Sequence, residues 1–260
     1  MLLALDLGNT NLTLGLFEGD TLRHSWRLET VHTRTEDEYA LLVRQLLEME
    51  GFAAGDVDGA ILASVVPSLT PTMVRVCERS FGAPPLVVGP GLRTGISVRY
   101  DPPKDVGADR VVNAVAAHAR FSGPCIVVDF GTATTFDCVL ADGTYAGGAI
   151  APGIQLSMGA LFSRAAKLPK VDLGRPERAV GRSTVESIQS GVYFGYVGLV
   201  DALVERIRAE MEEPEVEVIG TGGLAPEIAR DARTIRHVDL DLTLDGLRRI
   251  FHLNTRRRGG

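Results

Sequence analysis

The chain has 260 residues, of which 45% are hydrophobic and 23% are charged, and this composition is typical of a folded globular enzyme. Its formal net charge of −6 argues against a protein that binds duplex DNA, because such a protein needs a basic face toward the phosphates. The 3 cysteines include no Cys-x-x-Cys pair and the 5 histidines are scattered. We therefore expect buried thiols in the reducing cytoplasm, and neither a disulfide framework nor a zinc site.

The first part of the chain alternates between expected strands and helices. Strands are expected at 2–6, 12–17, 22–28, 60–66 and 85–89, and helices at 35–49 and 70–81. The helix at 35–49 has the clearest start, since Thr35 and Glu38 can form a capping box ahead of an apolar face. The three leading strands would form an antiparallel meander, and the whole pattern predicts an α/β layered fold.

The opening pattern returns in the middle of the chain, at 125–143. Placing Asp129 on Asp6, an offset of 123 residues, also brings Gly131 onto Gly8. A repeat with a period near half the chain predicts that one α/β domain has been duplicated, although two buried strands that each end in Asp-x-Gly can also match by chance. We place the two domains at 1–117 and 118–260.

The second half continues the alternation into a long polar loop and a long helix. Expected are a helix at 154–166, a polar loop at 167–182, a helix at 184–212, an apolar strand running into Thr221-Gly222-Gly223, and a frayed tail at 256–260. We expect the loop, which is rich in Lys, Arg, Pro and Gly, to be the most flexible segment. The apolar stretch at 188–204 is too short for a membrane span and contains Asp201, so we expect a buried helix there.

Three glycines of this long helix, Gly191, Gly195 and Gly198, fall on one face because of their spacing. Another backbone could approach this face closely. The sequence leaves open whether that backbone belongs to the protein's own core, or whether the face meets a second subunit or a ligand.

The two repeated turns carry the groups that a phosphate chain and its metal ion require, namely close backbone N–H groups, hydroxyl or amide side chains, and a carboxylate. The first offers Asp6-x-Gly8-Asn9-Thr10-Asn11, and the second offers Asp129-x-Gly131-Thr132-x-Thr134-Thr135. Gly222-Gly223 is a third candidate, since glycine lets a flat adenosine group approach the backbone. A tight β-turn whose Asp and Asn side chains bond their own backbone explains any one of these turns equally well. The sequence has neither a Walker nor a Rossmann glycine motif, so a nucleotide would have to lie in the cleft of a duplicated domain.

Asp109 stands at the start of an expected helix, within Gly107-Ala108-Asp109-Arg110. An aspartate in this place commonly caps the helix N-terminus. It could also accept a proton from a substrate hydroxyl while Arg110 holds an anionic part of the same substrate. The two roles are compatible, because a capping bond fixes the carboxylate in place.

Together these motifs resemble those of the type III pantothenate kinases. The resemblance rests on Asp6-Leu-Gly-Asn-Thr-Asn11, Gly107-Ala-Asp-Arg110, Asp129-Phe-Gly-Thr-Ala-Thr-Thr135, Gly147-Gly-Ala-Ile-Ala-Pro-Gly153 and Thr221-Gly-Gly223, in that order. It covers nearly the whole chain and is far more specific than any single motif. It implies a kinase of the actin, Hsp70 and sugar-kinase superfamily, with two duplicated ribonuclease H-like domains and a nucleotide cleft between them.

The resemblance also implies roles for individual residues in the phosphorylation of pantothenate by ATP with Mg²⁺, the first step of coenzyme A biosynthesis. Asp109 would be the general base, and Asp129 would bind a monovalent cation, K⁺ or NH₄⁺. The ATP-binding residues would be Asp6, Leu7, Gly8, Asn9, Thr10, Asn11, Leu12, Thr13 and Thr132, and the pantothenate-binding residues would be Tyr100, Gly107, Ala108, Asp109, Arg110 and Thr184. Members of the family are homodimers with pantothenate bound near the subunit interface, and we expect neither a nucleic-acid nor a membrane partner.

Two other functions stay open. A different small-molecule kinase of the superfamily would share both phosphate turns but need not contain Gly107 to Arg110. A regulator that binds ATP without transferring phosphate would also keep the turns, and some relatives of the family have been described as transcriptional activators. The acidic net charge weighs against DNA contact in this chain.

Overall fold

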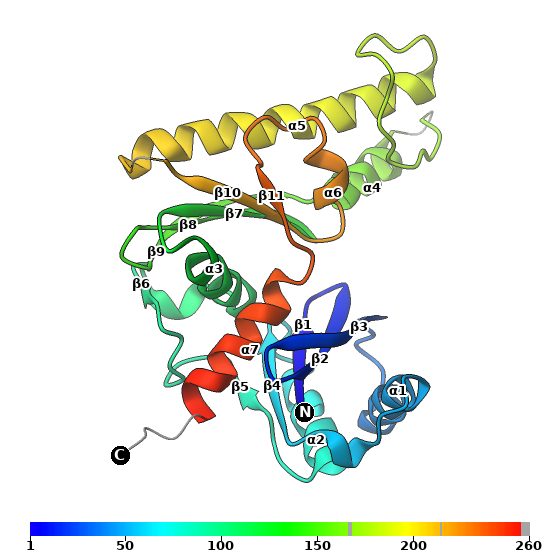
Figure 1. Ribbon diagram of the computed structural model, residues 1–260. Helices are drawn as coiled ribbons and strands as arrows, with labels where there is room; N and C mark the ends of the chain where they lie inside the picture. Colours follow the sequence, from blue (N-terminus) through cyan, green and yellow to red (C-terminus); the bar gives the residue numbers. More distant parts are fainter. Residues whose placement is uncertain (166–167, 214, 256–260) are drawn as a thin grey trace. The chain divides into compact units, whose positions relative to one another are not determined.

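A computed structural model describes residues 1–165, 168–213 and 215–255 of the protein (Figure 1). These residues form a mixed α/β structure with two sheets, which confirms the predicted fold class. The chain divides into two compact units, of which the first contains Met1–Ala116 with Leu242–Gly260 and the second contains Ala117–Asp241. The tail expected at 256–260 lies outside the described residues.

The sheet of the first unit begins with the predicted antiparallel meander. β1 (Leu2–Leu7) pairs with β2 (Asn11–Glu18), and β2 pairs with β3 (Thr21–Glu29). On its other side β1 pairs in parallel with β4 (Gly59–Ser64), and β4 pairs in parallel with β5 (Leu86–Val87). The resulting order is β3-β2-β1-β4-β5, so β1 lies at the centre of the sheet.

Helices cover both faces of this sheet. α1 (Glu36–Met49) and α2 (Thr70–Phe81) share a hydrophobic core with the face of β1 that carries Leu5. α3 (Ala108–Phe121) and α7 (Leu242–Thr255) form a second core with the opposite face of β1 and β4. Successive side chains of a strand point to opposite faces, so a strand that is covered on both sides has to be apolar throughout. β1 is apolar except at Asp6, near its carboxyl end.

The capping box predicted for α1 is present. The N–H of Thr35 donates to Glu38 Oε2 at 2.7 Å, and the N–H of Glu38 donates to Thr35 Oγ1 at 3.4 Å. The two bonds use backbone donors that the helix itself leaves unpaired, so they fix where the helix begins.

Helix α7 was not assigned from the sequence, and the predicted division placed its residues with the second half. In the structure α7 packs on β1 and β4 of the first unit. Two strand glycines leave room for its side chains, since a Cβ on Gly15 would lie 2.8 Å from Leu244 and a Cβ on Gly59 would lie 2.5 Å from Phe251. Only the folded sheet shows why these two strand positions lack a side chain.

The second unit repeats the strand plan of the first. Its strands are β7 (Cys125–Phe130), β8 (Ala133–Val139), β9 (Thr144–Pro152), β10 (Glu217–Thr221) and β11 (His237–Val238). β7, β8 and β9 form an antiparallel meander, while β10 pairs in parallel with β7 and with β11. The offset of 123 residues carries both ends of β1 onto those of β7, and the two strands share one burial pattern. The duplication predicted from the sequence is confirmed.

One face of this second sheet shares a core with α4 (Ile154–Arg164), α5 (Thr184–Met211) and α6 (Ala225–Ile228). α4 ends two residues before the predicted position 166, which lies outside the described residues, and α5 ends one residue before the predicted 212. Three short elements complete the described chain: η1 (Ala54–Asp56), β6 (Ser97–Val98) and η2 (Pro103–Asp105).

The glycine face of α5 is exposed. Gly191, Gly195 and Gly198 are each accessible to solvent, and no other part of the described chain comes within 4 Å of a Cβ built on any of them. Packing against the protein's own core therefore does not explain their spacing. Among the described residues, none of the helices combines the length and apolar character that a membrane crossing requires.

All 3 cysteines are buried thiols outside any disulfide, as predicted. Burial raises the pKa of Cys77 and of Cys125 to about 12. These thiols remain protonated at neutral pH, which makes them unreactive as nucleophiles.

Candidate active site

The first candidate turn joins β1 to β2. Asp6 is half-buried near the end of β1, whereas Asn9 and Thr10 are exposed at the tip of the turn. The N–H of Gly8 donates to the carbonyl oxygen of Asn11 at 2.9 Å. A Cβ on Gly8 would lie 3.2 Å from that same oxygen, so glycine allows the turn to close tightly.

The strand residues on either side of this turn differ in what they can offer a ligand. Leu7 and Leu12 pair across β1 and β2 and are fully buried in the hydrophobic core. They could contribute only backbone groups to a bound phosphate. Thr13 lies opposite Asp6 in the pair of strands and is half-buried, so its hydroxyl stands beside the carboxylate position.

Thr30 stabilises this turn, although no sequence motif points to it. Its Oγ1 donates to the carbonyl oxygen of Gly8 at 2.7 Å, and its N–H donates to the carbonyl oxygen of Thr10 at 2.9 Å. Thr30 is buried although it is polar. The only sequence signal was a threonine two residues after an expected strand, and such a threonine is too common to indicate a role.

Asp109 lies inside the first turn of α3, because the helix begins at Ala108. It is therefore not the residue ahead of the helix that the capping interpretation requires. Its Oδ1 accepts the N–H of Arg110 at 2.8 Å. Burial raises the pKa of Asp109, while the hydrogen bond and the positive charge of the buried Arg110 act in the opposite direction.

The start of α3 lies close to the end of β1 through a short chain of contacts. A Cβ on Gly107 would lie 2.4 Å from Asp109 Oδ1 and 3.4 Å from Val65. The N–H of Val65 in turn donates to the carbonyl oxygen of Leu7 at 3.1 Å. Asp109 therefore lies at the carboxyl ends of β1 and β4, the edge at which parallel strands usually bind ligands. Tyr100, by contrast, is exposed in the segment between β6 and η2.

The second candidate turn joins β7 to β8 and carries Asp129 and Thr132. The carbonyl oxygen of Thr132 accepts the N–H of Gly153 at 3.1 Å. A Cβ on Gly153 would lie only 2.2 Å from that carbonyl oxygen. Gly222 has a φ of +85° and lies against Asp129, since its Cβ would be 2.6 Å from Asp129 Oδ1 and 2.7 Å from the carbonyl oxygen of Phe130. Three stretches that are far apart in the sequence thus meet at the carboxyl end of β7.

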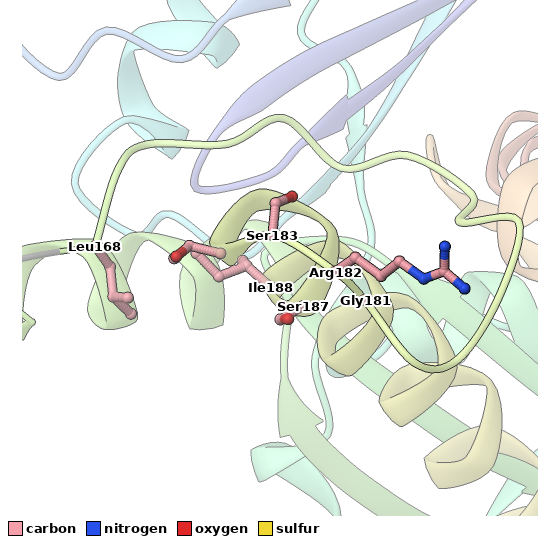
Figure 2. Close-up of a pocket in the computed structure, with 7 residues that line it drawn as sticks. Leu168, Gly181, Arg182, Ser183, Ser187 and Ile188 are labelled. Atoms are coloured by element: carbon pink, nitrogen blue, oxygen red, sulfur yellow. The ribbon is translucent and has the colours of Figure 1, made fainter.

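Thr184 is the first residue of α5 and belongs to a different part of the second unit. Ser183 caps this helix, because its Oγ accepts the N–H of Glu186 at 3.2 Å. A pocket of about 620 Å³ lies here, with Leu168 on one side and Thr184 and Ile188 among its lining residues. Figure 2 shows Arg182 extending away from Leu168, with its guanidinium group at the far end.

Each unit therefore presents an Asp-x-Gly turn, with hydroxyl groups, at the carboxyl end of its central strand. Backbone N–H groups and hydroxyls in such a turn can bind phosphate oxygens. No group of three or more His, Cys, Asp or Glu residues within the described ranges could hold a metal ion by itself. A magnesium ion in such a site would need the phosphates as further ligands, as Mg²⁺ in nucleotide sites generally does.

A profile of the type III pantothenate kinases matches residues 2–206. A type III pantothenate kinase from Anaeromyxobacter sp. (strain K) is 52% identical over 254 residues, which are 98% of this chain and 100% of that protein. Among solved structures, a Baf family transcriptional activator from Campylobacter jejuni is 18% identical with a TM-score of 0.59, covering 97% of this chain and 98% of the other. An inorganic polyphosphate/ATP-glucomannokinase from Arthrobacter sp. strain KM is 14% identical with a TM-score of 0.52, covering 97% and 98%. At such identities the two structures support the fold alone, a two-domain fold of the sugar-kinase type.

Proposed function

The chain belongs to the type III pantothenate kinase family, and on this premise we propose how its residues share the work of the reaction. It is a kinase that phosphorylates pantothenate in coenzyme A biosynthesis, with ATP and a metal ion. This family membership decides between the functions that the turns alone left open.

The first turn binds the phosphates of ATP in this proposal. The residues involved are Asp6, Leu7, Gly8, Asn9, Thr10, Asn11, Leu12 and Thr13. The exposed tip offers amide, hydroxyl and backbone donors, while Asp6 orders the Mg²⁺ ion or its water shell. Thr132, on the corresponding turn of the second unit, supplies a further contact to ATP.

Asp129 binds the monovalent cation, K⁺ or NH₄⁺. Its Oδ1 and the carbonyl oxygen of Phe130 both pack closely against Gly222, at 2.6 and 2.7 Å from the position of a Cβ on that glycine, so the two oxygen atoms lie on the same side of the turn. A carboxylate and a backbone carbonyl are donors suited to a hard monovalent ion. The cation would add positive charge near the phosphates of ATP.

Asp109 is the general base, and its placement is the observation that carries the proposal. A half-buried carboxylate with a raised pKa is a better proton acceptor than an exposed one, and it lies at the edge of the sheet where β1 ends. The transition state of phosphoryl transfer is loose, so most of the catalysis comes from alignment and charge neutralisation, and the base has only a modest proton transfer to assist.

The remaining residues bind pantothenate. Arg110 pairs with its carboxylate, since a guanidinium group is the usual partner for that group. Gly107, Ala108, Tyr100 and Thr184 are the other proposed contacts to the substrate, and Thr184 would offer its hydroxyl from the pocket at the start of α5. We also infer a cytoplasmic location and no nucleic-acid partner, from the buried thiols and the net charge of −6.

The active form is a homodimer in this proposal, with α5 at its interface. The exposed glycines Gly191, Gly195 and Gly198 would let a second backbone approach closely. Leu156 on α4 and Val185 on α5 are 57% and 42% exposed, so these two helices also carry exposed apolar side chains. Sedimentation of the wild type should show a dimer, and Gly195→Arg should shift it to the monomer.

The deciding experiment measures ADP release from ATP and Mg²⁺, with and without pantothenate, in potassium buffer and again in sodium buffer. We expect release that requires pantothenate and falls sharply in sodium. Release that ignores pantothenate would refute the proposed substrate. Equal rates in the two buffers would refute the cation site at Asp129.

The role of Asp109 is tested by Asp109→Asn in the same assay. We expect turnover to fall by about 10²–10⁴-fold, the usual contribution of a general base. Asp105→Asn is the matched control, because it makes the same chemical change at an exposed position four residues earlier. An Asp109→Asn variant that keeps more than about a tenth of the wild-type rate would rule out this role.

A further inference from the structure

The segment from residue 168 to residue 183, here called the strap, connects α4 to α5 without forming a helix or strand. None of its residues is buried, although Leu173 packs partly against the core of the second unit. Apolar burial therefore contributes little to fixing its position. Polar contacts with the elements beneath it have to decide where it lies.

Two side chains of α5 hold the backbone of the strap. Gln189 Nε2 donates to the carbonyl oxygen of Asp172 at 3.2 Å, and Ser190 Oγ donates to the carbonyl oxygen of Ala179 at 2.6 Å. Near the end of the strap, a Cβ on Gly181 would lie 2.5 Å from the backbone nitrogen of Ser187. The strap therefore lies directly on the first turns of α5.

A third anchor ties the strap to the segment after α6. Arg175 Nε donates to Asp231 Oδ2 at 2.7 Å, and Arg175 Nη2 donates to Asp231 Oδ1 at 2.9 Å. The hydroxyl of Tyr193, which is fully buried, lies 2.9 Å from Asp231 Oδ2 and from the carbonyl oxygen of Glu227. Arg175 binds both carboxylate oxygens of Asp231, and the buried Tyr193 fixes this carboxylate in place. Such an ion pair is stronger and more specific in geometry than an ordinary surface ion pair.

The end of the strap forms one wall of the pocket at Thr184. Gly181, Arg182 and Ser183 line this pocket, and Leu168 at the other end of the strap lines it as well (Figure 2). Both ends of the strap thus contribute to the pocket, whereas the Arg175 anchor lies between them in the sequence. A displacement of the middle of the strap would therefore move the residues at its two ends that line the pocket.

We propose that the Arg175–Asp231 ion pair is a positioning device that holds the strap on the second unit, so that the pocket at Thr184 is already formed when pantothenate arrives. The inference rests on the proposed contact between Thr184 and pantothenate. A preformed wall spares the substrate the cost of ordering the strap, and this gain belongs to pantothenate binding alone. ATP binding and the chemical step do not depend on it.

Kinetics of Arg175→Gln and Asp231→Asn provide the first test. We expect the KM for pantothenate to rise by about fivefold, while kcat and the KM for ATP stay within about twofold of the wild type. Arg175→Lys, which keeps the charge but loses the two-pronged geometry, should fall between the wild type and Arg175→Gln. Arg178→Gln removes an exposed arginine of the same strap and should leave all three parameters unchanged. A parallel rise of both KM values, or no rise in either, would overturn the inference.

Limited digestion with trypsin tests the anchor without any substrate. Asp231→Asn leaves every strap cleavage site in place, including the exposed Lys170 and Arg178. We expect faster cleavage at these two sites than in the wild type. Unchanged cleavage would overturn the inference even if the kinetics behaved as expected. Failure of the wild type to phosphorylate pantothenate would instead refute the proposed function, since the digestion result does not depend on it.

Discussion

Replacing Gly222 with alanine tests how closely the turn after β10 packs against Asp129. Gly222 has a φ of +85°, a conformation that glycine adopts freely and other residues adopt at a cost. The new Cβ would also meet Asp129 Oδ1 at 2.6 Å and the carbonyl oxygen of Phe130 at 2.7 Å. The second contact is with backbone, which cannot rotate away. Gly222→Ala therefore combines backbone strain with a forced displacement next to the proposed cation site.

The two costs can be assigned separately. A left-handed backbone costs a residue with a Cβ about 1–2 kcal/mol, and overpacking costs about 1–3 kcal/mol, so the free energy of unfolding should fall by about 2–5 kcal/mol. Gly51 provides the matched control, because its φ is +81° and nothing lies within 4 Å of its Cβ. Gly51→Ala should show the backbone cost alone.

Thermal unfolding of the two variants measures the difference. Each kcal/mol lowers the melting temperature by about 2–4 °C in a protein of this size, so Gly222→Ala should melt about 2–12 °C below Gly51→Ala. Potassium titration of Gly222→Ala should also need a higher concentration for half-maximal activity, because the carboxylate of Asp129 is pushed aside. Equal melting temperatures for the two variants would refute the reasoning about the close contact.

Three further predictions follow from the hydrogen bonds and the pKa shifts. Asp109→Asn should melt no lower than the wild type at pH 7 in calorimetry. The folded-state pKa of Asp109 is raised, so the wild type loses stability as pH rises through that pKa. Below the ordinary value of 3.8 the two proteins should have equal melting temperatures, because the wild-type carboxyl group is then neutral. Thr30→Val removes the bond to the Gly8 carbonyl and should cost about 1 kcal/mol in urea unfolding, with a higher KM for ATP and an unchanged KM for pantothenate. The hydrogen bonds from Arg175 and Tyr193 lower the pKa of Asp231 to about 2, so the stability that this carboxylate contributes is complete above pH 3.8 and lost as pH falls toward 2. Asp231→Asn should remove this acid dependence from the melting curves. A wild-type melting temperature that changes instead near pH ~6 would contradict the assignment.

The duplicated strands were predictable because their signal is local. Leu2 to Asp6 and Cys125 to Asp129 are short apolar runs that end in the same Asp-x-Gly turn, and a strand buried on both faces has to be apolar along its length. The capping box of Thr35 and Glu38 was likewise contained in four consecutive residues. Features of this kind need no knowledge of the rest of the fold.

Other features depend on contacts between distant parts of the chain, and no local pattern contains them. The bond from Thr30 to Gly8 and the approach of Gly222 to Asp129 exist only once the strands have paired. The start of α3 was recognisable from the sequence, but the place of Asp109 beside the end of β1 was not. The glycine spacing on α5 placed three glycines on one face, yet only the structure showed that this face, Gly195 included, is exposed and not packed against the described chain.

The packing of α7 on the first sheet has a consequence for the order in which the protein is made. Residues 242–255 complete a core whose other members include Ala4 and Ile61, close to the beginning of the chain. During synthesis, the contiguous second unit is fully available before α7 emerges from the ribosome. Contacts between residues so far apart in sequence form slowly, and the unfinished side of the first sheet exposes apolar surface in the meantime. The half of the protein that is translated first is therefore the half that finishes folding last.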